Sequence, residues 1–242
     1  METGPGRRYH PRSVGPRSMS QASTPLTSEH FAYVAERTRG EDPFLQELKA
    51  AAVTAGIPAI WIAPEQASLM QILLKAAGAR RVVEVGTLAG VSAIQMARAV
   101  PARDAGGLVQ TIEIDPERAR FAEEWIARSN VADRIEVLVG QGAERLAELP
   151  AGAFDAAFLD ADKQGYARYL RECLRLVRPG GLILVDNAFA FGELFTAAPT
   201  PDVAAVRAFN DRMAATEGLH GVIVPLGDGL WVAVVEETAR PA

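Results

Sequence analysis

Apolar and polar residues follow two different periods along this chain, and the change between them marks its organisation. Near the start, three stretches are predicted helices: 28–39 opens with a Ser cap followed by an acid, 42–55 opens with Asp-Pro, and 64–77 carries apolar side chains at helical spacing. From residue 81 onward, short continuous apolar runs alternate with further helical stretches. The predicted strands are 81–85, 108–114, 134–139, 154–160 and 182–186, and the predicted helices between them are 91–100, 116–129, 143–148 and 165–177. This alternation is typical of a parallel sheet covered by helices on both faces, which predicts an α/β fold.

The end of the chain breaks the alternation. After a predicted helix at 203–216, two predicted strands at 221–225 and 230–235 are separated only by residues 226–229. A connection that short cannot cross over to a parallel strand, so the two strands must pair as an antiparallel hairpin. We therefore expect a mostly parallel sheet closed by one reversed hairpin, in a single domain over residues 26–242.

Residues 1–25 differ from the rest, because they are rich in Gly, Pro, Ser and Arg and almost free of large apolar side chains. Such a segment cannot bury enough surface to offset its ordering entropy, so we expect a disordered leader. Its prolines and glycines disfavour the amphipathic helix of a transit peptide. A start of translation at Met19 is a simpler explanation of this extension.

Composition and charge exclude several binding partners and indicate a cellular location. The chain has 242 residues and a formal net charge of −5, so it lacks the basic surface that nucleic-acid binding needs. Its single cysteine, Cys173, excludes an internal disulfide and fits a reducing, cytoplasmic location. No apolar run reaches the ~20 residues that span a bilayer, so we expect no membrane association.

Two of the predicted strands end abruptly in oxygen-bearing side chains. Asp160 ends the first, Asp186 and Asn187 end the second, and Lys163 follows one helical turn after Asp160. Ligands of open parallel sheets bind outside the carboxyl ends of the strands, which predicts that these side chains meet there. Two carboxylates and an amide oxygen suit Mg²⁺, Ca²⁺ or Mn²⁺. Singly, each residue has an ordinary explanation as a helix cap, a turn residue or a solvated charge, but together they favour metal-assisted chemistry.

The turn after the first predicted strand, residues 84–92, is a second candidate ligand site. Its glycines permit close approach of a ligand to the backbone in front of a helix N-terminus. Their Gly-x-x-x-Gly spacing is not that of a dinucleotide-binding turn, and we expect Glu84 to repel a diphosphate. Glu113 ends the next strand, where a carboxylate can accept both hydroxyls of a ribose. This combination favours a cationic nucleoside cofactor without phosphates, although a helix cap is an ordinary explanation of Glu113 alone.

These motifs resemble those of the cation-dependent class I S-adenosylmethionine O-methyltransferases, which include caffeoyl-CoA and catechol O-methyltransferases and many bacterial relatives. The Asp-Ala-Asp-Lys run with the downstream Asp-Asn is specific to this family, whereas the glycine turn marks only the wider superfamily. The resemblance implies a Rossmann-like, seven-stranded, mostly parallel sheet with a reversed C-terminal strand, and a homodimer. It is carried by residues 62–66, 83–92, 154–163, 178–181, 186–187 and 225–230.

The resemblance also implies which residues bind each group. Asp160, Asp186 and Asn187 are the implied metal ligands, with Mg²⁺ as the first choice, and Lys163 together with Asp160 forms the implied catalytic pair. The acceptor would be a small phenolic molecule with vicinal hydroxyls. The implied S-adenosylmethionine site consists of Ile62, Glu84, Gly86, Thr87, Ser92, Glu113, Gly142, Ala143 and Asp162.

The segment after the metal pair departs from the family. It lacks a tryptophan common in relatives and instead carries Phe189, Phe191 and Phe195, which suit a substrate wall, core packing or a dimer contact. Val222 is expected where the catechol enzyme has an acid facing the second hydroxyl. These departures concern the identity of the substrate and leave the cofactor expectation unchanged.

The expected reaction needs an activated hydroxyl. Phenols titrate near ~10, as tyrosine does, so few are ionised at neutral pH. A divalent cation that chelates two neighbouring oxygens lowers this pKa, and a partly desolvated Lys163 is suited to accept the proton. Two alternatives remain at this point: a nicotinamide-dependent oxidoreductase of similar fold, and a non-catalytic S-adenosylmethionine-binding module.

Overall fold

The computed structural model describes residues 25–237. The predicted disordered leader lies outside these residues except for its last position, as does the suggested start at Met19. The strands are β1 (Arg81–Val85), β2 (Leu108–Glu113), β3 (Ile135–Val139), β4 (Phe154–Leu159), β5 (Val177–Val185), β6 (Leu219–Val224) and β7 (Leu230–Val235). The helices are α1 (Ser28–Arg37), α2 (Pro43–Thr54), α3 (Pro64–Ala76), α4 (Val91–Ala97), α5 (Pro116–Arg128), α6 (Gly142–Glu148), α7 (Tyr166–Leu176) and α8 (Pro201–Ala215), with short 3₁₀ turns η1 (Arg103–Ala105), η2 (Ala132–Arg134) and η3 (Lys163–Gly165).

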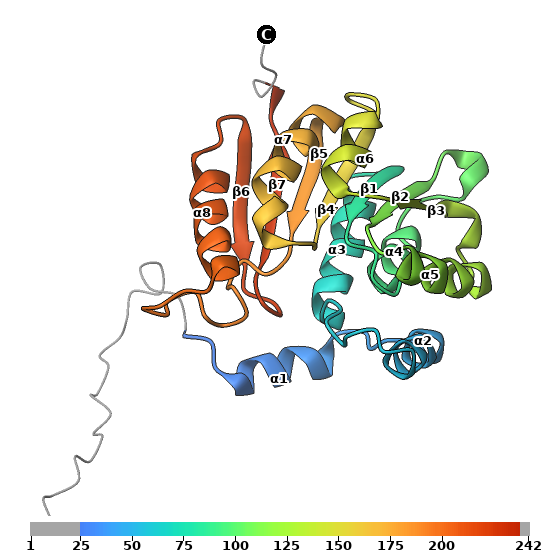
Figure 1. Cartoon of the computed structure of the whole chain (residues 1–242), viewed down its shortest axis with the longest axis horizontal. Helices are drawn as coiled ribbons and strands as arrows, with labels where there is room; N and C mark the ends of the chain where they lie inside the picture. Colours follow the sequence, from blue (N-terminus) through green and yellow to red (C-terminus); the bar gives the residue numbers. More distant parts are fainter. Residues whose placement is uncertain (1–24, 238–242) are drawn as a thin grey trace, which may run out of the picture.

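The strands form one seven-stranded sheet in the order β3-β2-β1-β4-β5-β7-β6 (Figure 1). The pairs from β3 to β5 are all parallel, whereas β7 is antiparallel to both β5 and β6. The predicted C-terminal hairpin is therefore confirmed, and β7 is the reversed strand of the expected fold. The order reverses direction at β1 and β4, where open α/β sheets bind their ligands.

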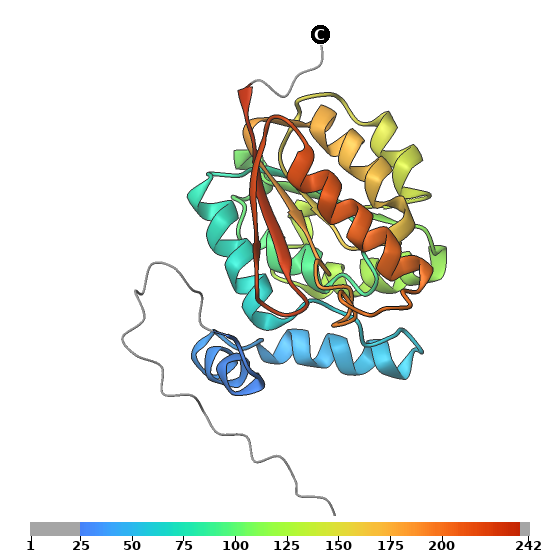
Figure 2. The ribbon, with the colours of Figure 1, turned by 90° about the vertical axis from the view of Figure 1, so that its left-hand side faces the viewer.

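Helices cover both faces of the sheet because successive residues of each buried strand point to opposite sides (Figure 2). Val82 and Phe158 pack into a cluster with residues of α2, α3, α4 and α5. Their neighbours Val83 and Leu159 pack into a second cluster with residues of α6, α7 and α8. The central strands are thus apolar on both faces, which explains why they appear in the sequence as continuous apolar runs.

The helix at the start of the described chain is an exception to this packing. None of the residues of α1 is buried, and Tyr33 is 60% exposed. Figure 1 shows α1 and α2 beside the end of the sheet where the parallel strands terminate. Among residues 25–237, no helix combines the length and the apolar character needed to cross a bilayer.

The start of β5 corrects a sequence prediction. We expected a helix to residue 177 and a strand only from 182, but β5 begins at Val177. Val177 pairs with Phe154, and the register then shifts before the pairing resumes at Ala156. The extended Arg-Pro-Gly-Gly segment therefore depends on a long-range partner, which its turn-like sequence does not reveal. Smaller differences occur at α4, which ends at Ala97 instead of residue 100, and at β6, which begins two residues early.

Asp155 links the beginnings of three neighbouring strands. Its carboxylate accepts hydrogen bonds from the backbone N–H groups of Arg80 (2.8 Å) and Arg81 (2.9 Å) and from Nε of Arg178 (2.7 Å). Burial alone would raise the pKa of Asp155, but these donors outweigh it and lower that pKa below its ordinary value. The ionised carboxylate is therefore a stabilising element at the end of the sheet opposite the expected site.

Candidate active site

The hydrogen-bond ladder of the sheet continues one residue past the strands and fixes the two aspartates side by side. The Asp160 N–H donates to the Val85 carbonyl (2.9 Å), and the Asp186 N–H donates to the Leu159 carbonyl (3.0 Å). Asp160 and Asp186 thus occupy the tips of adjacent parallel strands, β4 and β5. Asn187 follows in the left-handed region with φ 63°, a conformation that asparagine tolerates better than most residues.

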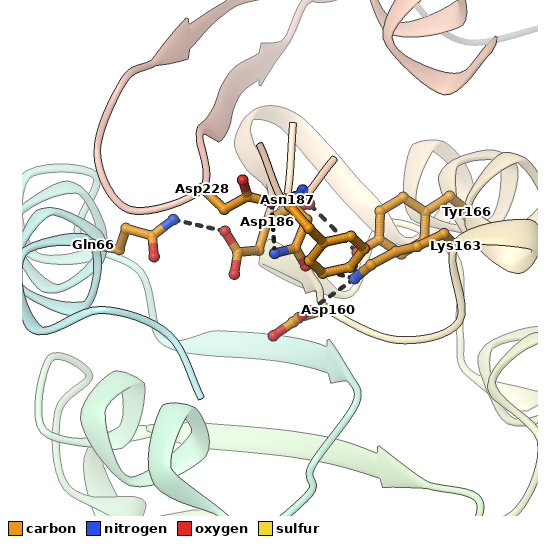
Figure 3. A network of polar contacts seen from close by, with 8 residues as sticks. Gln66, Asp160, Lys163, Tyr166, Asp186, Asn187 and Asp228 are labelled. Atoms are coloured by element: carbon orange, nitrogen blue, oxygen red, sulfur yellow. Dashed lines mark hydrogen bonds and ion pairs between the residues drawn. The ribbon is translucent and has the colours of Figure 1, made fainter. Parts of the chain in front are cut away.

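Lys163 lies at the centre of this cluster on η3 (Figure 3). Its side chain is only 8% exposed. The ammonium donates to Oδ1 of Asp160 (3.1 Å), to Oδ1 of Asn187 (2.6 Å) and to the Tyr166 hydroxyl (2.7 Å). The structure therefore brings Lys163 together with two of the three expected metal ligands, as the strand ends predicted.

Asp186 is held from a distant part of the chain. Nε2 of Gln66, on α3, donates to Oδ1 of Asp186 at 2.6 Å (Figure 3). Burial, together with the nearby Asp160 carboxylate, raises the pKa of Asp186 to about 7. This is the behaviour of two neighbouring carboxyl groups whose negative charge is not fully compensated.

This donor set fits a hard divalent cation. Two carboxylates and an amide oxygen are its preferred ligand types, and the cation would supply the missing countercharge at Asp186. No cluster of three His, Cys, Asp or Glu side chains arranged for a metal occurs between residues 25 and 237. The expected site therefore depends on Asn187 as its third ligand.

A cavity of about 560 Å³ lies beside this cluster at the carboxyl ends of the parallel strands, and its size suits a cofactor. Of the predicted site residues, Glu84, Ala143 and Asp186 do not line it. Those in its wall are Ile62, Gly86, Thr87, Ser92, Glu113, Gly142, Asp160, Asp162, Lys163 and Asn187. The cavity thus connects the predicted cofactor residues with the predicted metal ligands, while the role of each residue stays a prediction.

Glu84 corrects part of the sequence argument. Its side chain is fully buried in β1, and neither carboxyl oxygen has a hydrogen-bond partner among the described residues. Burial raises the pKa of Glu84 from 4.5 to about 8; the nearby Ser92 and Thr111 hydroxyls offset only part of this rise. The Glu84 carboxyl is thus buried, absent from the cavity wall and hard to ionise, so it does not present a negative charge to a diphosphate in the cavity. The reason given for disfavouring a dinucleotide was therefore wrong at this residue.

Gly86 has a structural role that the sequence did not indicate. Its φ is +106°, and a Cβ at this position would stand 1.9 Å from the backbone oxygen of Asp160. The glycine thus allows the chain after β4 to pass directly against the turn after β1. Gly86 therefore helps to bring Asp160 to the cavity, and it also leaves room for a ligand to approach the backbone.

Glu113 is held firmly at the other end of the cavity. Its Oε2 accepts a hydrogen bond from the Leu88 N–H (2.8 Å), and its Oε1 accepts one from the Asp115 N–H (3.0 Å). The same Asp115 side chain caps α5 by accepting from Glu117 N–H (2.8 Å). The carboxylate of Glu113 is therefore oriented by backbone groups rather than by a cation, and it stays available in the cavity wall.

The three phenylalanines of the departing segment have different surroundings. Phe191 lines the cavity although it is 59% exposed, Phe195 is 92% exposed and lies outside it, and Phe189 packs against Gly229. Val222 lies on β6, is 59% exposed and is not part of the cavity wall.

Other wall residues escaped the sequence reasoning because single apolar or charged positions carry no motif. Among them are Ile60, Trp61, Ile114, Arg118 and Asp202. Gln66 belongs to one of the runs that carry the family resemblance, residues 62–66, but its contact with Asp186 spans 120 positions in sequence.

A doubly wound sheet with a cofactor-sized cavity at the carboxyl ends of its parallel strands defines the class as a Rossmann-like enzyme. The O-methyltransferase family matches residues 35–235, and the chain belongs to this family. Two relatives named catechol O-methyltransferase are similar to it. The one from Niastella koreensis is 34% identical over 84% of this chain and 95% of the relative, and the one from Mycobacterium tuberculosis is 35% identical over 85% and 92%.

A solved structure supports the same assignment. The O-methyltransferase from Bacillus cereus, in complex with SAH (S-adenosylhomocysteine), matches with a TM-score of 0.76 and 32% identity over 85% of this chain and 96% of that chain. The predicted family, fold and O-methyltransferase activity class are thereby confirmed. Membership of this family speaks against the oxidoreductase alternative.

Proposed function

We propose that the protein transfers the methyl group of S-adenosylmethionine to one hydroxyl of a catechol-like molecule, with a divalent cation bound by Asp160, Asp186 and Asn187. The observation that carries this proposal is the convergence of those oxygens and Lys163 beside one cavity whose far wall contains Glu113. That arrangement suits a cofactor at one end and a metal-bound acceptor at the other.

The cofactor end of the cavity is proposed from its residue types. The carboxylate of Glu113 suits the two ribose hydroxyls, and Gly86, Thr87 and Ser92 surround the start of α4. Asp162 accepts a hydrogen bond from the Tyr169 hydroxyl and suits the ammonium of the methionine part. Solved relatives that contain SAH support this choice of cofactor.

A divalent cation, with Mg²⁺ as the first choice, would bind two neighbouring acceptor oxygens and lower the pKa of the hydroxyl that reacts. The chain contributes the remaining chemistry. Lys163 Nζ lies within hydrogen-bond reach of Asp160 and Asn187, so its neutral amine, formed when the ammonium gives one proton to solvent, would be the proton acceptor for a hydroxyl bound at this edge. S-adenosylmethionine, when bound, would supply the methyl group to the acceptor oxygen, and the electron pair of its carbon–sulfur bond would stay on sulfur.

The acceptor is proposed from the wall near the metal ligands. The Phe191 ring lies 5.6 Å from Lys163 Nζ and lines the cavity there, and Ile60 and Trp61 add apolar and aromatic surface to the same cavity. Such a surface suits a planar phenol, and a bidentate vicinal diol uses the coordination positions that three protein ligands leave open. Relatives named catechol O-methyltransferase agree with this class of substrate.

The remaining expectations are part of the same proposal. We place the protein in the cytoplasm, as its lone buried cysteine favours, and we expect it to act as a homodimer without nucleic-acid or membrane partners.

The proposal is tested by a methyl-transfer screen over phenols with vicinal and non-vicinal hydroxyls. With S-adenosylmethionine and Mg²⁺ we expect turnover of vicinal diols only, abolished by EDTA and restored by Mg²⁺. Turnover that is indifferent to EDTA would refute the role of the cation. Tight S-adenosylmethionine binding without turnover of any diol would instead favour a non-catalytic binding module.

A further inference from the structure

The turn between β6 and β7 reaches across to the loop that follows the metal ligands. Asp228, in this turn, accepts hydrogen bonds at Oδ2 from Asn187 Nδ2 (3.2 Å) and from the Phe191 N–H (2.7 Å). Its Oδ1 accepts one from the Gly192 N–H (3.2 Å). A single half-buried carboxylate therefore contacts the predicted metal ligand Asn187 (Figure 3) and also the backbone of the cavity-lining Phe191.

The loop that Asp228 holds has an unfavourable backbone. Asn187, Ala190 and Phe191 have φ values of 63°, 54° and 60°, in the left-handed region that side chains other than glycine and asparagine avoid. The N–H groups of Phe191 and Gly192 point into the Asp228 carboxylate, so the anion stabilises this conformation. Backbone bonds from Phe189 to the Asp228 carbonyl and from Ala188 to the Gly229 carbonyl (both 2.9 Å) add to the attachment.

The orientation of the Asn187 amide follows from its two charged neighbours. Its nitrogen faces the Asp228 carboxylate and its oxygen faces the Lys163 ammonium. The reversed amide would place N–H donors against an ammonium and an oxygen against a carboxylate, so both contacts would become repulsive. The orientation seen here is the one in which the amide oxygen is presented to the metal ligand cluster.

We propose that Asp228 is a positioning residue: it fixes the Asn187 amide with its oxygen toward the cation and holds Phe191 in the cavity wall. This inference rests on the proposed cation-dependent function. Residues that orient metal ligands change metal affinity by about 10–100-fold when they are replaced. Asp228 is not a proposed metal ligand and does not line the cavity, so its loss should weaken metal binding and leave S-adenosylmethionine binding unchanged.

The test compares wild type with Asp228→Asn and with Asp104→Asn, a matched control at an exposed aspartate on η1. Mn²⁺ binding is measured from the electron paramagnetic resonance signal of the free ion, and S-adenosylmethionine binding by calorimetry. For Asp228→Asn we expect the Mn²⁺ dissociation constant to rise at least tenfold and that of S-adenosylmethionine to stay within twofold. Asp104→Asn should match wild type in both. An unchanged Mn²⁺ constant for Asp228→Asn would overturn the inference.

A second measurement needs no variant. Hydrogen exchange of the wild-type segment 187–192 is followed with and without Mn²⁺, and we expect the ion to slow it, because Asn187 and the loop amides share Asp228. Exchange that Mn²⁺ does not change would also overturn the inference. Wild type that binds no Mn²⁺ would refute the proposed function itself, whereas Mn²⁺ binding that Asp228→Asn leaves intact would refute only the role of Asp228.

Discussion

Replacement of Lys163 separates its two chemical abilities, positive charge and proton acceptance. Lys163→Arg keeps the charge next to Asp160 and Asn187, but a guanidinium does not give up its proton in proteins and cannot act as a base. Lys163→Met removes both abilities. If Lys163 is the base, both variants should lose turnover, whereas a purely electrostatic lysine would be replaced well by arginine.

The expected loss of turnover follows from the usual contribution of a general base, and the expected loss of stability follows from the contacts of Lys163. General-base catalysis contributes about 10²–10⁴-fold, so we expect kcat to fall at least ~100-fold in both variants, which is about 3 kcal/mol in activation free energy. Lys163→Met also leaves oxygens of Asp160 and Asn187 without a donor, and we expect it to lower the free energy of unfolding by roughly 1–3 kcal/mol. The Tyr166 hydroxyl is less affected, because it also donates to the Asp186 carbonyl (3.4 Å).

The assay is methyl transfer to a simple catechol at saturating Mg²⁺, measured from pH 7 to about 10. The deficit of both variants should shrink toward the upper end, since phenols ionise there without a base. Lys75→Met, on the exposed side of α3, serves as the control and should behave as wild type. Lys163→Arg with turnover within threefold of wild type at pH 7 would refute the assignment of the base.

Three further predictions concern the framework around the site. Gly86→Ala should lower the free energy of unfolding by about 3 kcal/mol or more and weaken Mn²⁺ binding, because the new Cβ would clash with the Asp160 backbone. Denaturant unfolding checks this. Gly40→Ala, where a Cβ meets no other atom, is the control. Glu84→Gln should become more stable relative to wild type as pH rises from about 4.5 to 8, by on the order of 4 kcal/mol. The reason is that Glu84 ionises over this range only in the unfolded wild-type chain, which favours unfolding of wild type. Free energies of unfolding that change equally with pH in both proteins would contradict this. Asp155→Asn should cost about 1–2 kcal/mol at pH 7, and the cost should disappear as pH falls through the lowered pKa of Asp155, since protonation removes the same charge; thermal unfolding at pH 7 and pH 3 tests it.

The arrangement of the sheet was predictable because its strands are buried on both faces and therefore stand out as apolar runs. Asp160, Asp186 and Asn187 could then be placed together, because each follows one of these strands and the carboxyl ends of parallel strands lie at the same edge of the sheet. The start of β5 could not be predicted, because Val177 becomes a strand residue only through its pairing with Phe154.

The supporting contacts of the site were not accessible to sequence reasoning either. Gln66 and Asp228 approach the metal ligands from elements far away in the chain; both lie in runs that carry the family resemblance, but those runs do not reveal their contacts with Asp186 and Asn187. Glu84 was misplaced because a glutamate beside a glycine turn resembles an exposed charge. Only the packing around β1 shows that it is buried, and burial raises its pKa to about 8.

The central claim is that two carboxylates and one amide from adjacent strand tips hold a divalent cation beside the cofactor. The most direct test is a crystal structure with Mn²⁺ and S-adenosylhomocysteine, with the ion located from its anomalous scattering. We predict one strong peak in contact with Asp160, Asp186 and Asn187, at roughly the 2.0–2.6 Å of hard cations. A cavity that contains S-adenosylhomocysteine, with no peak between these three side chains, would contradict the account.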